Sequence, residues 1–139
     1  LPPSARGPFR QQALGADLEL ARGYWILRGE AVWSRWNMPA VEETLLDSPL
    51  DALGAYAELR YKLRPGLYLA GRLEHLGFSA VDSALGRKSW DAPVTRLELG
   101  AGYSIRRELL LKASWQHNSR DAGLVRKNDL FAVQVLLWY

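Results

Sequence analysis

Apolar and polar residues alternate with a period of two through most of this 139-residue chain, and this alternation limits its possible folds more than any other feature. In residues 131–139, one face of an extended strand is apolar throughout, while the other face carries Gln134. The apolar face consists of Phe131, Val133, Val135, Leu137 and Tyr139. A period of two is typical of β-strands rather than helices. A strand this apolar on one side needs a cover for that side.

Seven segments share this alternation, and together they predict an all-β fold. They are residues 14–22, 24–36, 53–63, 67–78, 94–105, 109–118 and 130–139. In residues 94–105, for example, Leu97, Leu99 and Ala101 occupy one face, and Arg96 and Glu98 the other. No segment places a charge in the middle of its apolar face. Each strand should therefore separate an apolar surface from a charged one.

The connections between these segments alternate in length. Tight turns at residues 22–23, 64–66 and 106–108 alternate with longer polar loops at residues 37–52, 79–93 and 119–129. Short turns at one end and long loops at the other are typical of bacterial outer-membrane barrels. The sequence thus predicts an antiparallel up-and-down transmembrane β-barrel, in which lipid covers the apolar faces and every backbone group is paired.

Composition limits the alternatives. The chain is 48% hydrophobic and 24% charged, with a mean hydropathy of −0.18, values that an ordinary soluble domain also has. Barrel strands are compatible with these values, because they interleave lipid-facing with lumen-facing residues. No apolar run approaches the roughly 20 residues of a spanning helix. The net charge of +3 is spread among acidic residues, and the chain has no Cys. We therefore expect no nucleic-acid partner and no disulfide or thiolate site. No loop has the spacing of a calcium hand or a zinc site, so we also expect no metal site or cofactor.

The number of predicted strands is odd, whereas single-chain bacterial barrels have an even number. Residues 1–13 contain three prolines, which make a further strand there unfavourable, so we assign them to an incoming loop. We expect that the chain is the C-terminal part of a larger barrel, or that strands of other chains or copies complete it.

Oppositely charged residues recur two positions apart on the polar faces. The predicted lining residues are Arg28, Glu30, Glu58, Arg60, Lys62, Arg72, Glu74, Arg96, Glu98, Lys112 and Gln116. They could form a solvated ladder that stiffens the wall, or a pore lining that screens solutes. With Asp17 and Glu19 included, acids and bases balance, so their number predicts neither anion nor cation selectivity.

Aromatic residues near the strand ends are predicted to lie at the two membrane interfaces. Trp25, Tyr61, Tyr103 and Tyr139 lie toward the short turns, and Trp33 and Trp115 toward the long loops. The alternative is a soluble sandwich or lipocalin-like barrel, in which these rings and the other apolar residues would face inward.

Residues 100–139 resemble the end of porin-type outer-membrane proteins of Gram-negative bacteria. The resemblance rests on a strand ending in Gly-x-Gly-Tyr, a short turn, a strand ending in a polar motif, and a last strand with a terminal aromatic. It implies passive diffusion of small polar solutes, contact with lipid and lipopolysaccharide, and a periplasmic C-terminus. It also implies that the barrel-assembly machinery recognises the apolar face from Phe131 to Tyr139.

Two other functions remain open from the sequence. A structural barrel could house or anchor an envelope partner, such as an electron-transfer protein. An outer-membrane hydrolase could use His117 with nearby Asn118, Ser119 or Asp121. However, His117 shares its parity with Trp115, which predicts that it faces the lipid interface.

Overall fold

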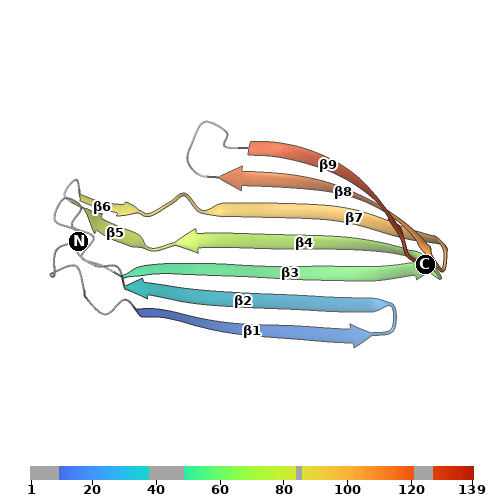
Figure 1. Cartoon of the computed structure of the whole chain (residues 1–139), viewed down its shortest axis with the longest axis horizontal. Coiled ribbons are helices and arrows are strands. Elements are labelled where there is room, and N and C mark those ends of the chain that lie inside the picture. Colours follow the sequence, from blue (N-terminus) through green and yellow to red (C-terminus); the bar gives the residue numbers. More distant parts are fainter. Residues whose placement is uncertain (1–9, 38–48, 84–85, 121–126) are drawn as a thin grey trace.

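The computed structural model describes residues 10–37, 49–83, 86–120 and 127–139, and only the backbone within residues 81–89. Seven strands form one antiparallel sheet in the order β1-β2-β3-β4-β7-β8-β9 (Figure 1). They are β1 Arg10–Arg22, β2 Trp25–Asn37, β3 Leu50–Arg64, β4 Leu67–Phe78, β7 Val94–Arg106, β8 Leu109–Arg120 and β9 Lys127–Leu137. The predicted all-β, up-and-down fold is confirmed. The described residues contain no helix that could span a membrane.

Several strands are longer than predicted, because the backbone ladder continues past the alternating residues. β1 begins at Arg10, inside the predicted incoming loop, and Gln12 pairs with Arg35 of β2. β3 and β9 each begin three residues earlier than expected, at Leu50 and Lys127. The hydrophobic alternation marks only the part of each strand with two distinct faces, so it underestimates the hydrogen-bonded length.

A small hairpin lies within the predicted loop at residues 79–93. β5 (Ala80–Ser83) and β6 (Gly86–Ser89) pair antiparallel, with Ala80 opposite Ser89. Each strand has only four residues, too few to show a clear alternation. The hairpin extends the connection between β4 and β7 beyond the end of the sheet (Figure 1).

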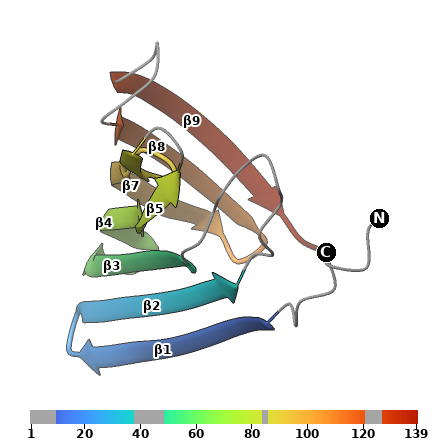
Figure 2. The same ribbon diagram turned by 90° about the vertical axis from the view of Figure 1, so that its left-hand side faces the viewer.

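The sheet curls, so that β1 and β9 lie at opposite ends of an arc (Figure 2). Its charged side lines the hollow, as Glu58, Arg60 and Glu98 show. The apolar side is exposed: alternate residues of β3 and β4, such as Leu59, Leu69 and Leu73, are open to the surroundings. We call the charged side the concave face and the apolar side the convex face. Polarity is thus inverted relative to a soluble barrel.

The sheet has almost no apolar core. Among the described residues, Leu50 and Ala92 are the only buried hydrophobic ones, whereas Leu14, Phe131 and Val133 are 70%, 79% and 74% exposed. Domains normally bury the apolar face of a sheet against a second layer. The curl is also open, because β1 and β9 each pair with one described strand only. Both the convex face and the two edges therefore lack a cover within the described part of the chain.

The tight turns between strands gather at one end of the sheet, which we call the turn end; the opposite end is the loop end. Gly23 and Gly66 occupy these turns with φ angles of 59° and 81°, in the left-handed region that favours glycine. A Cβ on Gly66 would lie 3.1 Å from the carbonyl oxygen of Ser104, while one on Gly23 would meet nothing within 4 Å.

The two glycines give a matched pair of substitutions. Gly23→Ala should lower the free energy of unfolding by about 1–2 kcal/mol, the cost of a left-handed L-residue. Gly66→Ala should cost more, because the same strain is joined by the contact with Ser104. Reversible urea unfolding followed by tryptophan fluorescence measures both. Equal losses would contradict the close packing of the second turn against β7.

Candidate functional site

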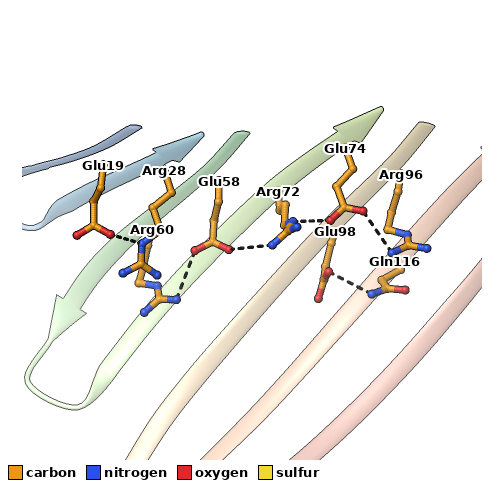
Figure 3. Close-up of polar contacts among 9 residues, drawn as sticks. All are labelled: Glu19, Arg28, Glu58, Arg60, Arg72, Glu74, Arg96, Glu98 and Gln116. Carbon is orange, nitrogen blue, oxygen red and sulfur yellow. Dashed lines mark hydrogen bonds and ion pairs between the residues drawn. The ribbon is translucent and has the colours of Figure 1, made fainter. Parts of the chain in front are cut away.

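The concave face carries a row of alternating charges across six neighbouring strands (Figure 3). In this row each residue lies directly opposite the next in the strand register. The members are Glu19, Arg28, Glu58, Arg72, Glu98 and Gln116. Acid alternates with base up to the final amide. This arrangement places every member beside a partner with which it can pair.

Ion pairs and hydrogen bonds connect much of this row. The Arg28 guanidinium lies 2.6 Å from the Glu19 carboxylate, and Gln116 Nε2 donates to Glu98 Oε2 at 3.1 Å. Arg72 Nη1 lies 4.0 Å from Glu58 Oε2. Each isolated exposed pair contributes only about 0–1 kcal/mol. Within the row, the contacts form three separate pairs.

A second row, two residues nearer the loop end, continues the network. Arg96 donates from Nε to Asn118 Oδ1 at 2.8 Å and lies 3.3 Å from Glu74 Oε2 through Nη1. Glu74 also pairs with Arg72, its neighbour on the same face of β4. The Glu74 carboxylate therefore joins the two rows.

Tyrosine rings fix the guanidinium groups of two lining arginines. Arg72 Cζ lies 3.8 Å from the centre of the Tyr56 ring, and Arg60 Cζ lies 4.7 Å from that of Tyr68. Such cation–π contacts are strongest when water is partly excluded. Tyr68 in turn covers Gly102, where a Cβ would lie 2.3 Å from the ring. Sequence analysis did not find these partners, although Tyr56, Tyr68 and Gly102 have the parity of the concave face.

Two hollows lie over this network. The larger, about 550 Å³, is lined by Glu30, Tyr56, Arg72, Glu74 and Arg96 among others. The other, about 260 Å³, lies nearer the turn end, and its lining includes Glu58, Arg60, Glu98 and Lys112. Both are lined by acidic and basic groups together, and the larger also by Val32, Leu76 and Val94.

All predicted lining residues lie on the concave face, because the register pairs even-numbered positions from β2 to β8. They do not form one continuous set of ion pairs. Among the described residues, Lys62, Lys112 and Glu30 have no ion-pair partner within 4 Å, and Glu98 bonds to an amide rather than a cation. The unpaired lysines lie toward the turn end.

The predicted interface aromatics lie on the convex face or beyond the last strand. Trp25 stacks on Tyr61 with ring centres 4.4 Å apart, and Tyr103 lies one row nearer the turn end. Trp33 lies near the loop end, opposite Leu14.

Trp115 faces Leu99 and Phe131 in the middle of the sheet, rather than in the row of Trp33. Tyr139 lies beyond β9 and is fully exposed. The predicted assembly residues Phe131, Val133, Val135 and Leu137 form the exposed convex side of β9, at the edge of the sheet.

His117 lies on the convex face near Trp115, as its parity predicts, with the ring centres 6.1 Å apart. Its Nδ1 lies 2.8 Å from Asp129 Oδ1 on β9, a partner that sequence analysis did not identify. Among the described residues, no serine or threonine hydroxyl hydrogen-bonds to His117, and Asp121 lies outside these residues. A histidine–carboxylate pair needs a nucleophile or a bound water to perform hydrolysis.

In the described segments, no three His, Asp or Glu residues cluster closely enough to hold a metal ion.

At the loop end, Asp91 accepts a hydrogen bond from the backbone N–H of Ala92 and another from Arg120. These bonds hold the pKa of Asp91 below its usual range. This contribution to stability is present above the ordinary pKa of an aspartate and is lost as the pH falls through the lowered one.

Comparisons of the chain with protein-family models, with curated proteins and with solved structures found no match.

The stacking of Arg72 on Tyr56 can be tested with a double-mutant cycle. Arg72→Gln and Tyr56→Leu should each destabilise the fold, and the double variant should lose less than the two losses added together. The expected coupling is about 1 kcal/mol, the usual size of a partly desolvated cation–π contact. Arg72→Lys is the matched control, because it keeps the charge and loses the planar group. Strict additivity would show that the ring contributes nothing to the network.

Proposed function

We propose that this chain forms part of the wall of a transmembrane β-barrel, which acts as a passive channel for small polar solutes across a bacterial outer membrane. The observation that carries this proposal is the inverted polarity of the curled sheet. Its convex face presents Leu73, Leu99 and Phe131, while its concave face holds the ion pairs around Glu58 and Arg72. Lipid outside and water inside would satisfy both faces.

The direction of the curl argues against a soluble barrel. A soluble barrel has its apolar side chains on the concave side, where they pack together as a core. Here the charged residues occupy that side, and curling the sheet further would bring charges rather than apolar groups together. An exposed apolar surface of this extent marks a contact with protein or membrane. A band that follows every strand of one sheet fits a bilayer.

The two open edges support a wall completed by further strands. β1 and β9 both run from the loop end to the turn end, so direct pairing between them would be parallel. An odd number of intervening strands would restore antiparallel pairing throughout. In lipid, an unpaired strand edge is strongly unfavourable. We propose that strands of the same or another chain pair with both edges, and that the turn end lies in the periplasm, because outer-membrane barrels have their short turns on that side.

The channel itself is tested by conductance. Protein reconstituted into planar lipid bilayers should give discrete, stable current steps, because the concave face would line a water-filled path. Heat-denatured protein is the control. A correctly folded barrel that inserts but passes no current would contradict the channel and favour a structural barrel occupied by a partner.

The lipid-facing assignment is tested by placing the same residue on either side of the wall. Leu99→Arg puts a cation in the middle of the convex face, and it should lower the free energy of unfolding in lipid vesicles by about 2–4 kcal/mol. Gln116→Arg puts it beside Glu98 on the concave face, where the change should stay within about 0.5 kcal/mol. If both variants are equally stable in vesicles, the convex face does not contact lipid.

A further inference from the structure

The charges of the concave face are segregated along the strands, although their total is balanced. The register gives this face a series of levels, each a row of positions directly opposite one another across the sheet, and four successive levels carry most of its charge. The next level toward the loop end has one charged side chain, Arg120, which pairs with Asp91. Adjacent levels are two residues apart, or roughly 7 Å along a strand. We number these four levels from the loop end to the turn end.

Of these four levels, the two nearer the loop end are acidic. The charged residues of the first level are Asp17, Glu30, Glu74 and Arg96, three carboxylates against one guanidinium. Those of the second level are Glu19, Glu58, Glu98, Arg28 and Arg72, three carboxylates against two guanidiniums. These levels have net charges of −2 and −1.

The two levels nearest the turn end are basic. Arg60 is the only charged residue of the third level, and Lys62 and Lys112 those of the fourth, within the described strands. Their net charges are +1 and +2. Their neighbours in the register include Ala70, Gly100 and Tyr68, none of which carries a charge. Over these four levels the net charge therefore changes in one direction, from −2 to +2.

The separation between the acidic and basic ends is long enough to matter in salt. The first and fourth levels are six residues apart, roughly 20 Å along a strand. A strand tilt of 35–45° reduces this to roughly 15 Å along a barrel axis. The Debye length is about 10 Å at 0.1 M salt, so a permeating ion meets the two ends as separate charged zones.

The neighbouring charges do not cancel this asymmetry. At the loop end, Arg35 pairs with Asp51 and Arg120 with Asp91, while Arg10 and Lys127 have the parity of the convex face. At the turn end, Arg64, Arg106 and Arg107 add positive charge, against Glu108.

We infer that this face makes the proposed channel a rectifier, with a cation-enriched zone at the loop end and an anion-enriched zone at the turn end. The inference rests on the proposed function. When the loop side is positive, cations and anions each move from the zone that concentrates them into the middle of the channel, and the conductance rises. With the opposite voltage both are drawn away from the middle, and the conductance falls.

The test is the current through single channels at equal positive and negative voltages in symmetric 0.1 M KCl. Coulomb's law with screening gives an enrichment of about 1.5- to 2-fold at each zone, so the currents should differ by roughly that factor. The larger current should flow with the loop side positive. In 1 M KCl the ratio should approach one, because the Debye length falls to about 3 Å. A charged thiol reagent added to one side of a Ser104→Cys variant establishes the orientation, since the chain has no other cysteine.

Charge reversal at the fourth level makes the test specific. Lys62→Glu with Lys112→Glu should abolish the rectification and increase the preference for cations. Lys62→Arg with Lys112→Arg is the matched control, and it should leave the rectification and the ion preference of the channel unchanged. Equal currents at both voltages in a conducting channel would overturn this inference alone. Absence of any conductance would instead overturn the proposed function on which it rests.

Discussion

The apolar convex face is the constraint on which the rest of the structure depends. A sheet with two faces of opposite polarity must hide one of them, and in most proteins a second layer does so. Here Leu14, Leu73 and Phe131 are exposed, and Leu50 and Ala92 are the only buried hydrophobic residues within the described ranges. The hydrophobic effect therefore stabilises this sheet only if something outside these strands covers the face. Lipid is the cover that we propose, because the apolar surface continues from strand to strand.

The concave face has the opposite need, since its charges must remain hydrated or paired. Arg72 meets this need with several partners: the Glu58 and Glu74 carboxylates and the ring of Tyr56. Surface ion pairs contribute little one by one, but shared partners restrict each other's rotamers. Packing of the Tyr68 ring against Gly102 also restricts a side-chain rotamer, without an ion pair. The result is a polar wall whose side chains have defined positions without an apolar core beneath them.

A fixed set of charges can act on ions only if its members do not cancel over the screening length. The rows near the loop end contain more carboxylates, while Arg60, Lys62 and Lys112 lie toward the turn end. Counting the charges along the sequence gives an even balance and hides this order. The positions of the charged residues along the strands, rather than their number, decide whether the wall is electrically uniform.

The sequence by itself determined the seven main strands, the turn positions and the assignment of nearly every side chain to a face. It could do so because alternation within a strand is a local property of extended backbone. It underestimated strand length at Arg10 and Lys127 and missed the β5–β6 hairpin, where polar or short segments carry no period.

Only the tertiary structure decided the direction of the curl, the pairing of His117 with Asp129 and the levels at which charges meet. These features depend on the register between strands and on their combined twist, which no single segment encodes.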